Sequence, residues 1–195
     1  MIRNFLTTIL LLKLLAFWQP AFSQSPPFKE GEKISYTVYY NWGLVWLNAA
    51  NVDFSVNSTT YEKKKVFRLL STGLSLPGYD WFFPVRDTFV SYIDTATMYP
   101  HFFHQNTSEG STKINNRLHF DYQTNRIKAQ LFDQKTGKSE KTIKFNKPVY
   151  DVLSAVYYCR TIDFKQLVIN QTVPVNTIID DSVHNLYIRL KGKEE

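Results

Sequence analysis

The chain has 195 residues, of which 44% are hydrophobic and 16% are aromatic, and it carries 23 basic residues against 17 acidic residues. The basic residues lie among acidic ones along the sequence, as between 138 and 144, so we expect no basic stripe and no nucleic-acid partner. The length suits one domain with a substantial core. The single cysteine, Cys159, excludes an intramolecular disulfide, so stability must come from packing.

The first 23 residues have the pattern of a removable export signal. Arg3 precedes an apolar run over 5–18, and small residues follow at 21 and 23, the positions that determine cleavage. The run is shorter than the roughly 20 apolar residues that span a membrane, and Lys13 interrupts it. We therefore expect a signal peptide over 1–23 and a mature chain beginning near Gln24, exported to the periplasm or associated with the outer envelope.

Most of the remaining sequence alternates apolar and polar residues with a period of two, which predicts short antiparallel strands. The expected strands, in chain order, are 34–40, 50–56, 65–71, 87–93, 101–105, 113–122, 126–132, 139–145, 173–179 and 185–190. Turns are expected at 41–43, where a glycine follows Asn41 and Trp42, and in the polar stretch 57–60. The pattern predicts a meander of neighbouring strands.

One stretch, after Pro148, has the spacing of a helix. Its apolar residues recur three and four apart: Val152, Leu153, Ala155, Val156 and Cys159. Asp151 is placed to accept hydrogen bonds from the first free amides, and Arg160 suits the carboxyl end. The sequence as a whole predicts a mainly β fold, a curved antiparallel sheet or open barrel in one domain over 24–195, with one packed helix near 151–160.

An aromatic run interrupts the strand pattern at 76–84. Prolines at 77 and 84 bracket it, and neither a ladder nor a helix easily accommodates two prolines so close together. We interpret the segment as a loop with an aromatic tip. Large aromatic side chains beside turns are candidates for ligand binding, although most aromatic residues must fill the core. The candidates are Trp42, Trp46, Tyr79, Trp81, Phe82 and Phe83.

The sequence contains no strong catalytic or metal-binding pattern. His101 and His104 are three apart, which on a strand puts them on opposite faces, so we expect no metal and no cofactor. No Gly-x-Ser-x-Gly motif occurs. The carboxylates at 80, 87 and 94 have ordinary structural roles available, including a pair between Asp87 and Arg86. A protein without catalysis is the favoured interpretation.

Three stretches together resemble a known family. They are 31–36 (Gly-Glu-Lys-Ile-Ser-Tyr), 86–94 (Arg-Asp-Thr-Phe-Val-Ser-Tyr-Ile-Asp) and 151–158 (Asp-Val-Leu-Ser-Ala-Val-Tyr-Tyr). Their order and spacing resemble the domain of unknown function 3108 family of exported bacterial β-rich proteins, from about residue 28 to the end. The resemblance implies an exported, curved sheet or open barrel without an established activity, and it assigns no catalytic residue. Family members continue beyond a segment like 187–195, so it also implies a domain incomplete at its C-terminus.

Three functional hypotheses follow from these features. The first is non-enzymatic binding of an apolar or amphipathic ligand such as lipid, with the aromatic loop as a lid or as a peripheral membrane contact. The second is an envelope assembly or interaction factor that pairs with a protein partner through a sheet edge. The third is a hydrolase acting on envelope material, for which Asp87 and His101 are the candidates.

Overall fold

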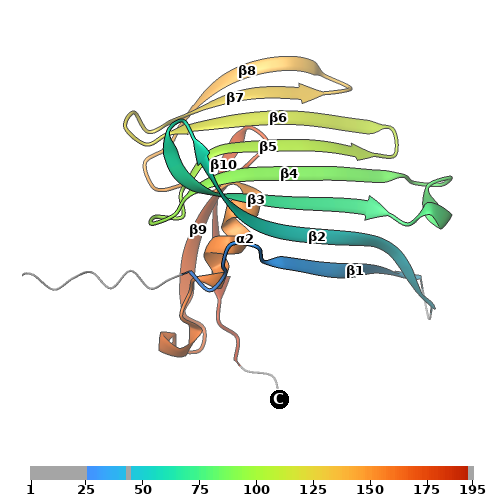
Figure 1. Cartoon of the computed structure of the whole chain (residues 1–195), viewed down its shortest axis with the longest axis horizontal. Coiled ribbons are helices and arrows are strands. Elements are labelled where there is room, and N and C mark those ends of the chain that lie inside the picture. The colour runs from blue at the N-terminus through green and yellow to red at the C-terminus, as the bar shows by residue number, and fades with distance from the viewer. Residues whose placement is uncertain (1–25, 43–44, 193–195) are drawn as a thin grey trace, which may run out of the picture.

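The computed structural model describes residues 26–42 and 45–192, and its main element is a large antiparallel sheet (Figure 1). The strands of this sheet are β1 (Lys33–Trp42), β2 (Val45–Tyr61), β3 (Lys64–Ser75), β4 (Val85–Asp94), β5 (Pro100–Glu109), β6 (Thr112–Asp121), β7 (Arg126–Asp133) and β8 (Gly137–Lys144). They are paired in chain order, and β1 and β8 form the two edges. The sheet is therefore open.

The C-terminal part adds a helix and a second, two-stranded sheet. Its elements are α2 (Val152–Arg160), the 3-10 helix η2 (Phe164–Gln166), β9 (Thr172–Ile179) and β10 (Ser182–Arg189). Another 3-10 helix, η1 (Pro77–Tyr79), lies between β3 and β4. The predicted fold, a mainly β protein with a large antiparallel sheet and one packed helix, is confirmed. Each expected strand is present, in most cases longer than its pattern indicated.

The turn predicted at 57–60 is wrong. Strand β2 continues through this stretch to Tyr61, and the chain turns instead at Glu62 and Lys63, whose φ angles are 47° and 65°. Residues 57–60 pair with β3, Ser58 with Phe67 and Thr59 with Val66. Polar side chains are compatible with a strand when the ladder partner is present, and threonine has a high strand propensity, so tertiary pairing overrides the local signal.

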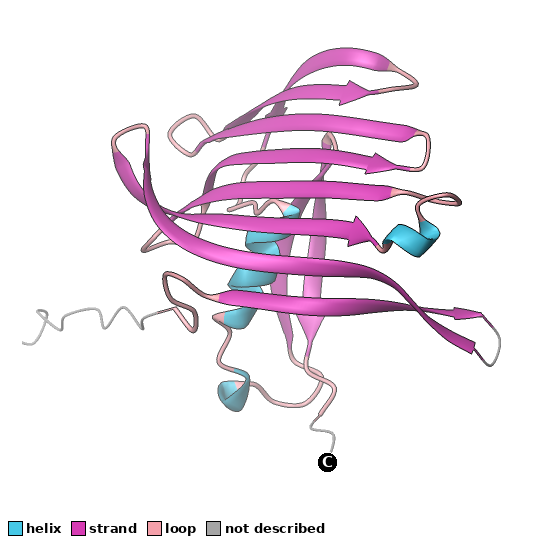
Figure 2. Ribbon diagram, turned by 45° about the vertical axis from the view of Figure 1, so that its right-hand side comes forward, coloured by secondary structure: helices cyan, strands magenta, loops and turns pink. Residues whose placement is uncertain are grey.

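The large sheet has an inner face that forms the core. A row of directly paired residues crosses this face and is almost completely buried: Val56, Leu69, Ser91, Phe103, Leu118 and Ala129. Leu153, Tyr157 and Ile178 complete the same cluster from α2 and β9. In Figure 2 the strands of the large sheet pass in front of α2 and the β9–β10 hairpin. The inner face is thus covered by these elements, and alternate residues point to the outer face.

Helix α2 is attached to the sheet through a buried carboxylate. Asp151 is fully buried, and its Oδ1 accepts hydrogen bonds of 2.9 Å from the backbone amides of Leu153 and Ser154. Its Oδ2 accepts from the hydroxyls of Ser91 at 2.7 Å and Ser154 at 2.8 Å. The predicted helix cap therefore also ties the helix to β4.

The C-terminal end of α2 contacts the segment that precedes β1. Arg160 pairs with Glu32, with an Nη1–Oε1 distance of 2.5 Å, and its guanidinium lies over the rings of Phe28 and Tyr157. The hydrogen bonds from Arg160 lower the pKa of the Glu32 carboxyl. Helices in the described part of the chain are all too short or too polar to cross a membrane. The predicted signal peptide, 1–23, lies outside the described residues.

Candidate functional site

Exposed large apolar side chains gather at one end of the large sheet, where the β1–β2 and β3–β4 connections lie (Figure 1). We call this surface the aromatic end, and it comprises Tyr36, Val38, Tyr39, Tyr40, Leu74, Trp81, Phe82 and Phe83, exposed to between 42% and 84%. Strand register brings them together, because Val38 pairs with Ala50, which in turn pairs with Ser75 at the start of the loop.

The loop between β3 and β4 turns tightly and directs two rings into solvent. Pro77 begins η1, where its missing amide hydrogen costs no hydrogen bond. The carbonyl of Tyr79 then accepts hydrogen bonds from the amides of Phe82 at 3.0 Å and Phe83 at 2.9 Å. Trp81 and Phe82, at the tip of the turn, are 84% and 75% exposed. The loop is therefore a defined turn that presents its aromatic tip.

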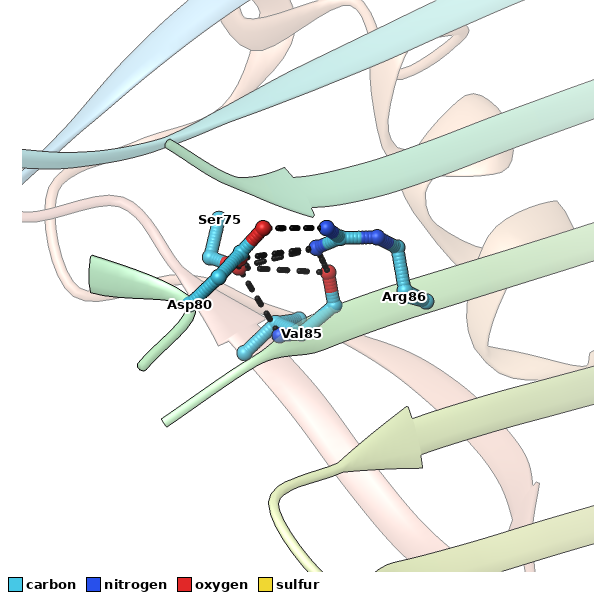
Figure 3. A network of polar contacts seen from close by, with 4 residues as sticks. All are labelled: Ser75, Asp80, Val85 and Arg86. Carbon is cyan, nitrogen blue, oxygen red and sulfur yellow. Dashed lines mark hydrogen bonds and ion pairs between the residues drawn. The ribbon is translucent and has the colours of Figure 1, made fainter. Parts of the chain in front are cut away.

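A polar network braces the base of this loop (Figure 3). Arg86 pairs with Asp80 through both carboxylate oxygens, at 2.5 and 3.1 Å. The hydroxyl of Ser75 donates to Asp80 at 2.5 Å and accepts from the amide of Val85 at 2.9 Å. Hydrogen bonds from Arg86 and then Ser75 lower the pKa of Asp80. The network closes the loop across the ends of β3 and β4.

The expected pair between Arg86 and Asp87 is wrong. Neighbouring residues on a strand point to opposite faces, so the side chains of Arg86 and Asp87 diverge, and Arg86 pairs with Asp80. Asp87 points to the inner face, where it accepts a hydrogen bond from the amide of Ser108 at 3.2 Å. Its burial, and then the neighbouring Glu109, raise the pKa of Asp87 to about 6.

The neighbouring β5–β6 hairpin supports the loop through a glycine. Gly110 has a φ of +57°, and a Cβ atom added there would lie 2.8 Å from the ring of Phe83. The amide of Gly110 donates to the carbonyl of Pro84 at 2.8 Å. A residue without a side chain is therefore needed for Phe83 to rest on the hairpin.

The sequence-predicted site residues are brought together only in part. Tyr79 is half-buried, whereas Trp81, Phe82 and Phe83 are exposed. Trp42 pairs with Val45, and Trp46 with Asn41, which places both backbones at the same end of the sheet. The side chains of Trp42 and Trp46 lie outside the described residues.

Sequence reasoning missed the contribution of β1 to this surface. Tyr36, Val38 and Tyr40 were expected only as one face of the strand 34–40 and were not named as site residues, yet they are 57%, 42% and 62% exposed. The consecutive apolar residues Val38, Tyr39 and Tyr40 were the available signal, since an apolar run supplies both faces of a strand at once.

The hydrolase candidates lie apart. Asp87 pairs with Thr107 near one end of β5, whereas His101 lies at the other end, about 20 Å away by strand geometry. His101 Nε2 is 3.9 Å from Asp94 Oδ2, and burial, with Lys64 nearby, lowers the pKa of His101. Over the described residues, no three His, Cys, Asp or Glu side chains are grouped closely enough to hold a metal ion.

Comparison with known proteins connects the chain to one family. Neither the curated proteins nor the solved structures contain a significant match. The model of a family described as "Protein of unknown function (DUF3108)" matches residues 35–195, which include every strand of the large sheet in whole or in part, helix α2 and the β9–β10 hairpin. Because this match covers most of the sequence, the chain belongs to the DUF3108 family.

Proposed function

We propose that this protein is an exported envelope protein that binds an apolar or amphipathic ligand, foremost a lipid surface, through its aromatic end and without catalysis. One observation carries the proposal: a braced turn holds Trp81 and Phe82 in solvent at 84% and 75% exposure. The export-signal pattern of residues 1–23 supports the location. The apolar character of the site supports the ligand class.

The energetics favour an apolar partner for this surface. Contiguous exposed apolar patches on soluble proteins mark interaction sites, and tryptophan is enriched where a protein meets the membrane interface. Burying a ring the size of phenylalanine contributes about 1.5–3 kcal/mol. The network around Asp80 holds the loop in its turn before binding, which lowers the entropy lost on association.

Vesicle flotation tests the proposal directly. The full mature chain is mixed with vesicles of phosphatidylethanolamine and phosphatidylglycerol, and the floated fraction is compared with that of the double variant Trp81→Ala/Phe82→Ala. Removing both rings should reduce the partition coefficient about 100-fold, which corresponds to roughly 3 kcal/mol. A double variant that floats as well as the wild type would refute the role of the loop.

A matched control comes from the other side of the molecule. Val168 and Ile169 follow η2 and are also highly exposed, at 70% and 66%. The variant Val168→Ala/Ile169→Ala removes exposed apolar surface that lies outside the aromatic end, so it should float like the wild type. An equal loss in both double variants would indicate non-specific adhesion and would count against the proposal.

A second candidate function, assembly through a sheet edge, is favoured by the difference between the two edge strands. Edge β8 has Lys138, Lys141 and Lys144, and charged edge residues protect against pairing with another chain. Edge β1 has no charged residue after Lys33, and its Tyr36, Tyr39 and Tyr40 are exposed. Strand addition along β1 would satisfy its free backbone groups.

Crosslinking in intact cells distinguishes this candidate from lipid binding. A photo-crosslinker at position 39, on β1, should give one dominant protein adduct if β1 receives a strand. The same crosslinker at position 142, on β8, is the control and should give none. Adducts to lipid alone, or equal protein adducts at both edges, would exclude assembly through β1.

A further inference from the structure

The outer face of the large sheet carries a second, chemically different surface. A single row of paired residues crosses five strands there: Arg68, Tyr92, Phe102, His119 and Lys128. We call it the outer row. In the figures α2 and the β9–β10 hairpin lie on the opposite face, so they leave the outer row uncovered (Figure 2). Its centre is aromatic and its two ends are cationic.

The rings at the centre of the outer row stack on one another. Tyr61 stands beside the row, with its ring centroid 4.9 Å from that of Tyr92 and 5.7 Å from that of Phe102, and both pairs are stacked. The centroid of Phe102 is 4.9 Å from that of His119. The hydroxyl of Tyr61 lies 3.3 Å from Nδ1 of His119. The faces that Tyr61, Tyr92 and Phe102 turn toward one another are thus occupied, whereas the rings of Phe102 and His119 are tilted by 55°.

The stacked rings restrict the chemistry of a partner. Single-stranded nucleic acids bind aromatic side chains by stacking bases on open ring faces, and the faces between Tyr61, Tyr92 and Phe102 are not open to a base. Ring edges carry the positive part of the aromatic quadrupole and therefore face anionic or hydrogen-bonding groups favourably. The Tyr61 hydroxyl and the His119 imidazole add hydrogen-bonding groups. The surface suits a polar, negatively charged partner.

Within the part of the chain that the structure describes, the cations at this surface form no close ion pairs, although the hydrogen bonds from Thr124 and then the charge of Lys128 lower the pKa of Asp121. Arg68 and Lys128 end the row, and Arg117 lies two residues before His119 on the same face. Among the described residues, no carboxylate pairs with Arg68, Arg117 or Lys128 within 4.0 Å. The nearby Asp94 and Asp121 accept hydrogen bonds from the amides of their own turns. Positive charge is therefore available to a ligand.

We propose that the outer row binds an acidic polysaccharide, with Arg68, Arg117 and Lys128 facing its carboxylates and Tyr61 and His119 its hydroxyl groups. The row spans four strand spacings, or about 19 Å, which suits an extended chain rather than a small anion. Separation from the aromatic end makes this site independent of the lipid-binding proposal, because the row lies within four residues of one end of each strand and the aromatic loop joins the opposite ends of β3 and β4.

Affinity electrophoresis in gels containing polygalacturonate tests the inference. The triple variant Arg68→Gln/Arg117→Gln/Lys128→Gln should lose binding at least about tenfold relative to the wild type. The control Lys135→Gln/Lys165→Gln/Lys191→Gln removes the same charge elsewhere and should bind like the wild type. Tyr61→Phe should weaken binding a few-fold while the unfolding midpoint stays unchanged. Neutral dextran should retard none of these proteins.

Several outcomes would overturn the inference. They are an unretarded wild type, an equal loss in the two triple variants, and single-stranded DNA that binds more tightly than polygalacturonate. Binding of phosphatidylglycerol vesicles that depends on the three cations, with no binding of polygalacturonate, would assign the row to a membrane and would also overturn it. Circular dichroism and thermal unfolding of each variant show whether a loss reflects misfolding.

Discussion

Two regions of the large sheet differ in which side chains they bury. They are the part of the inner face under α2 and the aromatic end. Under α2 a carboxylate, Asp151, is completely buried, and four hydrogen bonds satisfy it. At the aromatic end Trp81 and Phe82 are in solvent, and the polar residues Asp80 and Arg86 form the brace. Stability and the proposed lipid binding therefore depend on different residues, so substitutions should affect one without the other.

The largest effect on stability is expected at the buried carboxylate. Asp151→Ala removes a helix cap and leaves the hydroxyls of Ser91 and Ser154 without their acceptor. We expect a loss of about 3 kcal/mol in the free energy of unfolding at pH 5, measured by urea denaturation. Vesicle binding of the folded fraction should not change. A loss below about 1 kcal/mol would show that the cap does not hold the helix to the sheet.

The stability contributed by Asp151 should depend on pH in a defined direction. Burial raises the pKa of Asp151 to about 6, from 3.8 in an unfolded chain, so the folded state holds the proton more tightly. This contribution is complete below about pH 4 and is lost as the pH rises to about 6.

The variant Asp151→Asn keeps the cap without titrating. The stability difference between wild type and Asp151→Asn should therefore shift by about 2 kcal/mol in favour of the variant between pH 4 and pH 7. Urea denaturation at each pH measures it. Asp87 titrates in the same direction, so Asp87→Asn serves as a comparison, and a pH-independent difference for Asp151→Asn would contradict the assignment.

A smaller effect is expected where the loop rests on the β5–β6 hairpin. Gly110→Ala places a Cβ against the ring of Phe83 and strains a positive φ, whereas Gly137→Ala, with a φ of +83° and open space around it, brings only the backbone strain. We expect Gly110→Ala to destabilise by about 1 kcal/mol more than Gly137→Ala. It should also weaken vesicle binding. Equal effects of the two variants would remove the support assigned to Gly110.

The smallest effect on stability is expected at the loop tip itself. Trp81→Ala/Phe82→Ala removes side chains that are mostly in solvent, so the free energy of unfolding should change by less than about 0.5 kcal/mol. Thermal and urea unfolding check this, in parallel with the flotation assay. A large destabilisation would show that these rings are packed in the folded structure. Stability and the proposed binding would then depend on the same residues.

Local patterns predicted much of the fold. The alternation of apolar and polar residues located every strand, and the spacing of Val152 to Cys159 located α2, because these periods reflect the geometry of single elements. The prolines at 77 and 84 likewise indicated the aromatic loop. The same reasoning predicted the end of β2 too early, since β2 continues through the polar residues 57–60, where it pairs with β3.

The candidate surfaces were less predictable. Arg86 was expected to pair with its neighbour Asp87, but it crosses the loop to Asp80. Basic residues that lie among acidic ones in the sequence share one row across the sheet, because register aligns Arg68 on β3 with Lys128 on β7 at its two ends. These two residues are separated by tens of residues in the sequence, and no local pattern predicts their alignment.

The amino-acid sequence by itself determined the strands, the helix with its Asp151 cap, and the aromatic loop at 76–84, where two prolines disfavour both strand and helix. Each of these features depends on residues that are adjacent along the chain. Tertiary structure decided the rest. Strand register determines which side chains share a face, and packing of α2 determines which face forms the core. The network around Asp80 holds the loop so that Trp81 and Phe82 lie in solvent. These outcomes depend on contacts between residues that folding alone brings together.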